Sequence, residues 1–239
     1  MPSPTLKSQM FSALTFILAA WMLLVAGRGA TGSRVLERDG DLYLERAGTA
    51  LRLTSYGHNF DPQMSPDGRW VVYRSTPEWV EGGGYLATNV WLMNLKTRKA
   101  QRIAGQPGGA SNAGPYVNRE FPPHWSGDSQ TLTWLEWRIR SNDDRSQPSP
   151  TYLVQYTLSS AQRREAWVHV APGSSIPSAR GWDKIGWGND NLYADISGWE
   201  WVDDRTPVLT LGWPASERPP LRVRLDLASG LLTPAMKGR

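Results

Sequence analysis

Two patterns of apolar residues divide this chain. Residues 10–27 form a predominantly apolar stretch without a charged residue, between Lys7 and Arg28. From residue 34 onward the apolar residues gather in short runs rich in Val, Leu, Tyr and Trp, separated by turn clusters such as Pro66-Asp67-Gly68. No stretch after residue 33 keeps a helical period of apolar residues over about ten positions. The patterns predict one N-terminal helix followed by an all-β domain.

The apolar stretch is long enough to cross a membrane. Its 18 residues would span about 27 Å as a helix, against a hydrocarbon thickness of roughly 30 Å. Two interpretations compete: an uncleaved anchor, or a secretory signal cleaved after Val25-Ala26-Gly27. We favour the anchor, so we expect residues 1–32 to be a transmembrane helix and linker that contacts the lipid bilayer through residues 10–27. Lys7 then marks the cytoplasmic side, which places the domain of residues 33–239 in the periplasm or another extracytoplasmic space.

Internal repetition is the strongest signal in the β-rich part. The run Asp61–Tyr73 is answered by Pro122–Trp134, 61 residues later, and more weakly by Lys184–Ala194. Each copy precedes a predicted pair of strands: Asn89–Leu95 with Ala100–Ile103, Tyr152–Leu158 with Arg164–Val168, and Leu221–Leu227 with Leu231–Thr233. An incomplete first unit shows only such a pair, at Asp41–Glu45 and Leu51–Thr54. Repetition at this spacing predicts a repeat architecture.

The best unit resembles the repeats of the TolB-like β-propeller family. The resemblance rests on SPDGRWVVY at Ser65–Tyr73, followed at the family's distance by NVWLMNLKTRKAQRIA at Asn89–Ala104. In the first motif, Pro presets φ, Asp caps the local backbone and Gly accepts a positive φ, which suits a tight turn between two strands of one blade. The alternating side chains of Trp70 and Val72, and of Trp91 and Met93, are expected to fill the layers between blades.

Two departures from the family pattern shape the expected fold. Family units are about 40–45 residues long, but here the copies lie 61–62 residues apart, with the excess predicted at Thr76–Thr88, Arg138–Pro150 and Gly198–Pro220. Stacked blades would bring these three insertions to one face, which is the candidate binding surface. Only about four units fit, so we expect a small or incomplete propeller: either a distorted ring or an open arc with exposed strand edges.

The residue types present argue against several kinds of chemistry. The chain has no cysteine, so it has neither disulfides nor thiolate sites. Its net charge is only +4, without the basic stripe or the module that nucleic-acid binding requires. His58, His124 and His169 lack metal-ligand spacing, and no serine lies in a nucleophile elbow. The acidic pairs Asp143-Asp144 and Asp203-Asp204, each followed by an arginine, are interpreted as solvated loops. We therefore expect a protein that is not an enzyme and holds no cofactor or metal.

Tryptophan supplies the remaining candidates for function. Several of the 13 tryptophans fall in or beside the predicted insertions, where aromatic side chains could contact a partner. With nearby arginines they give the predicted partner-binding residues: Trp79, Arg138, Arg140, Trp199, Trp201, Arg205 and Trp213. The anchor, the incomplete propeller and the tryptophan-rich insertions together predict a function. They predict a membrane-anchored scaffold subunit on the extracytoplasmic face of a larger membrane protein complex, whether bioenergetic, photosynthetic or of envelope maintenance. The alternative is a secreted TolB-like module that binds an envelope protein or a glycan. Intact mass distinguishes the two, because cleavage removes the anchor.

Overall fold

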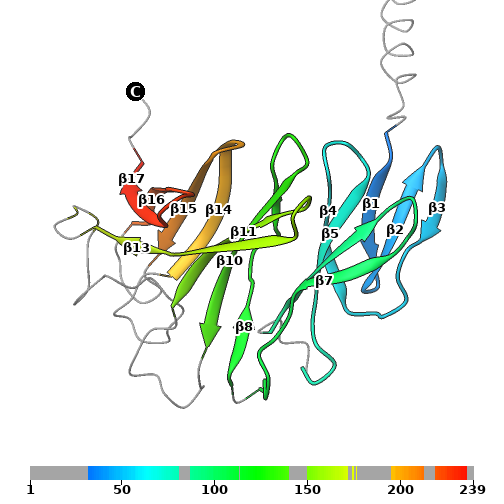
Figure 1. Ribbon diagram of the computed structural model, residues 1–239, viewed down its shortest axis with the longest axis horizontal. Coiled ribbons are helices and arrows are strands. Elements are labelled where there is room, and N and C mark those ends of the chain that lie inside the picture. The colour runs from blue at the N-terminus through cyan, green and yellow to red at the C-terminus, as the bar shows by residue number, and fades with distance from the viewer. Residues whose placement is uncertain are drawn as a thin grey trace, which may run out of the picture.

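The computed structural model describes residues 32–80, 87–112, 114–139, 150–171, 174, 176, 195–212 and 219–235. These residues form 17 strands in four sheets, which follow one another in chain order along the longest axis of the molecule (Figure 1). The prediction of an all-β domain is confirmed for this part of the chain.

Each sheet is built from consecutive strands. The first sheet has the order β1 (Arg34–Arg38), β2 (Asp41–Arg46), β3 (Thr49–Arg52). The second has the order β4 (Asn59–Met64), β5 (Trp70–Ser75), β6 (Asn89–Asn94), β7 (Ala100–Ala104). The third consists of β8 (Tyr116–Asn118), β9 (His124–Trp125), β10 (Thr131–Ile139), β11 (Thr151–Thr157) and β12 (Gln162–Trp167), with both β8 and β9 paired to β10. The fourth runs in the order β13-β17-β16-β15-β14, from β13 (His169–Val170), β14 (Asp195–Asp203), β15 (Thr206–Gly212), β16 (Leu221–Leu225) and β17 (Leu231–Pro234).

A hydrogen-bonded turn joins the first two strands of the second sheet. The Ser65 hydroxyl donates to Asp67 Oδ1 at 2.6 Å and accepts from the Trp70 N–H at 3.0 Å. Gly68 has a φ of +70°, in the left-handed region that glycine tolerates best. The tight turn predicted from Ser-Pro-Asp-Gly is therefore confirmed.

The same turn recurs in the third sheet, which explains the repetition in the sequence. The Ser126 hydroxyl donates to Asp128 Oδ1 at 2.5 Å and accepts from the Thr131 N–H at 2.9 Å. Ser129 stands where the first copy has glycine, with a φ of +61°. Its hydroxyl accepts from the Asp67 N–H at 3.0 Å, so the two turns are also bonded to each other.

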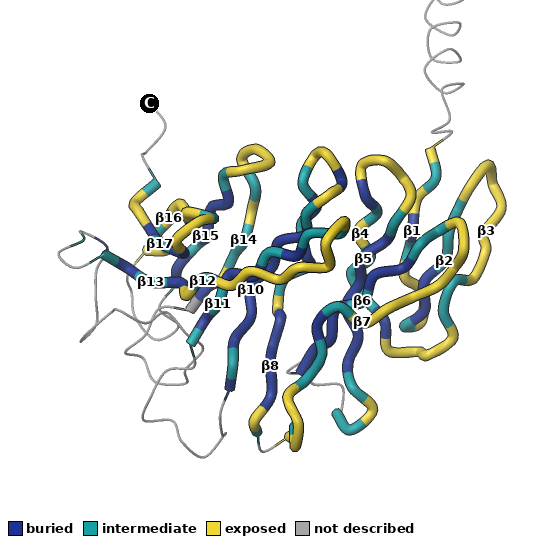
Figure 2. Tube along the Cα trace, viewed as in Figure 1, coloured by how far each residue is buried: buried dark blue, intermediate teal, exposed yellow. Residues whose placement is uncertain are grey.

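Three apolar layers form the core, one between each pair of neighbouring sheets, while exposed residues lie in the turns and along the outer strands β3, β7 and β12 (Figure 2). Alternation along a strand decides which layer a side chain enters. On β5, Val71 enters the layer shared with the first sheet, and Val72 enters the layer shared with the third. The predicted inter-blade positions are confirmed, because Trp70 packs beside Val72, and Trp91 and Met93 lie in the layer of Val71.

The row of sheets does not close into a ring. The first and fourth sheets lie at opposite ends of the longest axis, so the described residues form an open, propeller-like arc of four blades (Figure 1). Because neighbouring sheets pack face to face, the two ends of the arc expose sheet faces. Strand edges are present as well, since β3, β7 and β12 each end a sheet and are largely exposed.

Both end faces are charged and ion-paired. On the first sheet, Arg34 and Arg38 contact Glu45, with 2.7 Å between the charged atoms of the Arg34 pair. On the fourth, Arg222 contacts Glu200. Polar outer faces of this kind cap terminal units in repeat proteins and keep them soluble. The ends of the arc are therefore compatible with water.

One of the three predicted insertions is wrong, because it belongs to the fourth sheet. Most of Gly198–Pro220 is not an insertion, because β14 and β15 pair there as an antiparallel hairpin. Asp203 fixes its turn: one carboxylate oxygen accepts from the Arg205 N–H at 2.8 Å and the other from the Thr206 hydroxyl at 3.0 Å. Two register shifts interrupt the ladder, and such bulges break the alternation that identifies a strand in a sequence. The weak repeat copy at Lys184–Ala194 lies outside the described residues.

The predicted anchor also lies outside the described residues. Among those that are described, no helix is long and apolar enough to cross a membrane. Residues 10–27 therefore remain a membrane segment by prediction. The insertions at Thr76–Thr88 and Arg138–Pro150 follow β5 and β10, and their residues 81–86 and 140–149 are likewise outside the described part.

Candidate functional site

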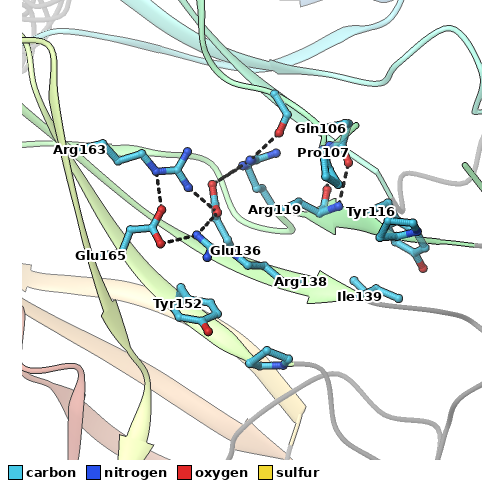
Figure 3. Close-up of a pocket in the computed structure, with 14 residues that line it drawn as sticks. Gln106, Pro107, Tyr116, Arg119, Glu136, Arg138, Ile139, Tyr152, Arg163 and Glu165 are labelled. Atoms are coloured by element: carbon cyan, nitrogen blue, oxygen red, sulfur yellow. Dashed lines mark hydrogen bonds and ion pairs between the residues drawn. The ribbon is translucent and has the colours of Figure 1, made fainter. Parts of the chain in front are cut away.

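A cleft of about 630 Å³ opens between the second and third sheets (Figure 3). This volume falls within the range of roughly 300–1,000 Å³ that is usual for ligand sites. The second sheet contributes the residues that follow β7, and the third contributes β8 and the facing ends of β10, β11 and β12. Its walls include Gln106, Tyr116, Glu136, Arg138, Tyr152 and Arg163.

The two sheets are bonded together beside the cleft. The Thr88 N–H donates to the Val117 carbonyl at 3.1 Å, which joins the start of β6 to β8. The Gln106 amide completes this seam: its Nε2 donates to the carbonyls of Thr88 and Val117 at 2.7 and 3.0 Å, and its Oε1 accepts from the Val117 N–H at 2.7 Å. The Gln106 side-chain amide thus takes the place of a backbone hydrogen-bond partner between the two sheets, and it links the two walls of the cleft.

A buried ion pair forms the floor of the cleft. Arg119 and Glu136 each have side chains only 1% exposed. Arg119 Nε and Nη2 lie 2.9 and 2.8 Å from Glu136 Oε1, and Nη2 also donates to the Gly105 carbonyl at 3.0 Å. Another guanidinium nitrogen donates to the Thr88 carbonyl. Arg119 therefore connects the second sheet to a charge at the centre of β10.

Glu136 remains ionised because positive charge surrounds it. Its Oε1 accepts from the Trp134 indole N–H at 3.0 Å, and its Oε2 accepts from Arg138 and Arg163 at 3.2 and 2.6 Å. Burial by itself raises the pKa of the Glu136 carboxyl. The charges of Arg119 and Arg163, with the hydrogen bonds from Trp134 and Arg119, outweigh burial and lower the pKa from 4.5 to about 2. A carboxylic acid of this strength is a poor general acid near neutral pH.

The rim of the cleft presents two arginines held in place by a second glutamate. Glu165 lies 2.6 Å from Arg138 Nη2 and 2.8 Å from Arg163 Nε. The Arg138 guanidinium also lies over the Tyr152 ring, 4.1 Å from its centroid. The Arg138 and Arg163 side chains are 33% and 29% exposed, so part of each reaches solvent. Both guanidinium groups are therefore held in place by ion pairs within partly exposed side chains.

The low pKa of Glu136 predicts a loss of stability in acid. The carboxylate stabilises the fold fully above its ordinary pKa of 4.5, and this contribution is lost as pH falls towards the folded-state pKa of about 2. Between neutral pH and about pH 3, the free energy of unfolding should fall by about 2 kcal/mol through this group alone. Urea unfolding at a series of pH values, followed by tryptophan fluorescence, measures the slope. Glu136→Gln should flatten it, and an unchanged slope in that variant would contradict the assignment.

Two of the predicted partner-binding residues, Trp201 and Arg205, come together in a smaller cleft of about 320 Å³ between the third and fourth sheets. The Trp201 ring stacks on His124 with centroids 3.9 Å apart and an angle of 11° between the rings. Burial lowers the pKa of His124, against the opposing charge of Asp204. The stack packs β14 of the fourth sheet against β9 of the third.

Two more predicted partner-binding residues lie at the same junction of sheets. The Trp199 ring contacts the Trp201 ring, with centroids 5.4 Å apart, and Trp79 and Trp199 are partly buried against the apolar layer between the third and fourth sheets. Arg138 lies in the larger cleft instead. Arg140 and Trp213 lie outside the described residues. Of the five predicted residues that the structure describes, four therefore lie at the junction of the third and fourth sheets, and one lies in the larger cleft.

Four charged residues of the larger cleft were not predicted from the sequence: Arg119, Glu136, Arg163 and Glu165. A signal for Glu136 was present, because it is the one charged residue from Leu132 to Trp137, a run with four apolar or aromatic residues. A strand that is apolar on both sides of its charge indicates that the charge is buried and needs a partner. The described residues contain no group of three or more His, Cys, Asp or Glu side chains that could hold a metal ion.

Comparison with known proteins identifies similar structures but no sequence family. No protein-family model matches the chain, and no curated protein matches it. TolB from Acinetobacter baumannii is similar over 84% of this chain and 40% of its own, at 15% identity and a TM-score of 0.44. The tricorn protease matches 84% of this chain and 21% of its own, at 13% identity and a TM-score of 0.46. The acylaminoacyl peptidase of Pyrococcus horikoshii matches 84% of this chain and 36% of its own, at 14% identity and a TM-score of 0.40.

These similarities concern the fold alone. The chain spans less than half the length of each of the three proteins. At such low identities and TM-scores, neither a binding partner nor an activity is transferred from them to this chain.

Proposed function

We propose that this chain is a non-catalytic interaction subunit, tethered to a membrane by residues 10–27, whose larger cleft receives an acidic segment of a partner protein. The observation that carries the proposal is the pair of guanidinium groups of Arg138 and Arg163 on the cleft rim, held in place by ion pairs within partly exposed side chains.

The charge of the cleft suits a carboxylate. Arg119, Arg138 and Arg163 face Glu136 and Glu165, which leaves one positive charge in excess. Arg138 binds the two glutamates through Nη2, and Arg163 binds them through Nη2 and Nε. Neither guanidinium uses Nη1 for these ion pairs, so Nη1 of each can donate a charge-assisted hydrogen bond to a carboxylate while the glutamates stay bound.

The remaining walls suit a polypeptide. Pro107, Pro115 and Pro150 line the cleft together with Tyr116 and Tyr152. Rigid apolar and aromatic surfaces lose little conformational entropy on binding, and aromatic residues and arginine are enriched at interface centres. A segment with acidic side chains beside apolar ones would match both parts of the wall.

The test compares which proteins remain bound after extraction from native membranes with a mild detergent. Arg138→Gln with Arg163→Gln should reduce retention of the partner by roughly tenfold or more, because each charge-assisted contact contributes about 1.5–3 kcal/mol. The charge-matched control is Arg222→Gln with Arg224→Gln on the outer face of the fourth sheet. Circular dichroism verifies that each variant is folded. The proposal fails if the partner stays with the cleft variant, or leaves both variants equally.

A further inference from the structure

The start of β1 and the tight turn of the second sheet lie on one edge of the molecule. Arg34 is paired with Glu45 at one end of the first hairpin. At the opposite end of that hairpin, the Gly40 carbonyl accepts from the Asn59 N–H at 2.8 Å, where β4 begins. The turn in which β4 ends therefore lies on the edge of Arg34, which is the upper edge in Figure 1.

Two hairpin turns share this edge. The turn at residues 46–49 adjoins Glu45 in the ladder of β2 and β3. The turn at residues 94–99 is joined to the tight turn, because the Leu95 N–H donates to the Arg69 carbonyl at 2.9 Å. We define the turn edge as Arg34 together with the turns at residues 46–49, 65–70 and 94–99.

The turn edge is basic. Its exposed cations are Arg34, Arg46, Arg69, Lys96, Arg98 and Lys99. Against these six stand two carboxylates, Glu45 and Asp67, so the described residues of this edge carry an excess of four positive charges. At the opposite edge of the same two sheets, five carboxylates outnumber three cations: Glu37, Asp39, Asp41, Asp61 and Glu78 against Arg38, Arg52 and Arg74, of which Arg38 also reaches Glu45. The cations are thus concentrated on one edge of the first two sheets.

The cluster at residues 96–99 is held in a fixed conformation. Asn94 Oδ1 accepts from the N–H groups of Lys96 and Thr97 at 3.0 and 2.9 Å. The Arg98 N–H donates to the Asn94 carbonyl at 2.7 Å, and Arg98 has a φ of +57°. The three cations therefore project from a structured turn at the surface.

The apolar stretch connects to this same edge. Seven chain steps separate Gly27 from Arg34, so Arg34 lies within about 25 Å of the end of the stretch. A bilayer spanned by residues 10–27 is therefore within reach of the turn edge. The larger cleft opens elsewhere, beside β8 and the ends of β10 and β11 that lie away from the repeated turns.

We infer that the turn edge docks on the anionic phospholipid headgroups of the membrane that holds the chain, so that the larger cleft faces the aqueous phase. This inference rests on the proposed membrane tether. Basic residues close to an anionic bilayer each strengthen association by roughly fivefold, and the effect fades over a Debye length of about 8–10 Å. When the turn edge faces the bilayer, its six cations lie close enough to the anionic headgroups for this attraction to act.

The test uses the absence of cysteine from the full chain. Thr97→Cys places a fluorescent label on the turn edge, and Ser55→Cys places one on the opposite edge at another exposed hydroxyl residue. The full-length protein is reconstituted into liposomes that contain a headgroup-nitroxide lipid, with and without phosphatidylglycerol. We expect strong quenching at position 97 only with phosphatidylglycerol, and weak quenching at position 55. K96Q with R98Q and K99Q should weaken the docked state by roughly a hundredfold, and added salt should act in the same direction.

The outcomes separate the tether from the orientation. If the chain washes off liposomes at alkaline pH, the tether of the proposed function fails and the orientation fails with it. If the chain stays but both labels are quenched equally, or the quenching ignores phosphatidylglycerol and the triple substitution, the tether stands and the orientation is overturned. Protection of position 97 in native membranes but not in liposomes would assign the edge to an acidic protein and overturn lipid docking.

Discussion

Glu136→Gln is expected to lower the free energy of unfolding by about 3–5 kcal/mol, the usual cost of removing one partner from a buried ion pair. The substitution keeps the size of the side chain and removes only its charge. Arg119 would then stay 1% exposed without a counter-ion, and Arg138 and Arg163 would lose the carboxylate that orients them. Urea unfolding of the detergent-solubilised chain, followed by tryptophan fluorescence, measures the change.

Glu165→Gln is the matched control for this prediction. Glu165 binds the same two rim arginines but is 35% exposed, and solvent screens its charge. Its loss should cost less than about 1 kcal/mol. Equal losses in the two variants would mean that burial does not set the strength of the network. The comparison also matters for function, because without the Glu136 carboxylate the Arg138 and Arg163 side chains of the proposed binding site would be less well ordered.

Gly40→Ala is expected to destabilise the first sheet by more than about 3 kcal/mol, through backbone strain and a steric clash. Gly40 has a φ of +75°, and a Cβ there would lie 2.1 Å from the Gly57 carbonyl oxygen. Because the obstacle is backbone, the segment around Gly57 must move. That movement would strain the hydrogen bond from the Gly57 N–H to Asp41 Oδ1, which is 3.1 Å long. Hydrogen exchange of the β1 and β2 amides, together with urea unfolding, measures the effect.

Gly48→Ala separates the two causes. Gly48 has nearly the same φ, +80°, but its Cβ would meet no atom within 4 Å. It should therefore cost only the left-handed strain of about 1–2 kcal/mol. If the two alanine variants were equally stable, the close approach of Gly40 and Gly57 would carry no energetic weight.

Much of the fold was predictable because its signals are local. The Ser-Pro-Asp-Gly turn involves Ser65, Asp67 and Trp70, all within six consecutive residues, so one short motif specifies its hydrogen bonds. The hairpins that follow each copy of the motif were predicted correctly for the same reason. Most of Gly198–Pro220 was wrongly assigned as an insertion, because bulges in β14 disturb the alternation that identifies a strand.

The cleft was far less predictable. Glu136 meets Arg119, 17 residues earlier in the chain, and Arg163, 27 residues later, and no local motif relates these three positions. The burial of the tryptophans was not predictable for a related reason. Trp79 and Trp199 fall within predicted insertions, but the depth to which an aromatic side chain is buried depends on the neighbouring sheet.

The sequence by itself determined the β class of the domain, the repeated turn and the apolar stretch at residues 10–27, since each depends on residues that are close together in the chain. The tertiary structure decided that the arc is open, that its end faces are charged, and that three arginines surround one buried carboxylate. It also decided that six cations from four separate segments share one edge. Burial and charge proximity arise only when distant segments pack together, so the site chemistry depends on packing that the linear pattern does not encode.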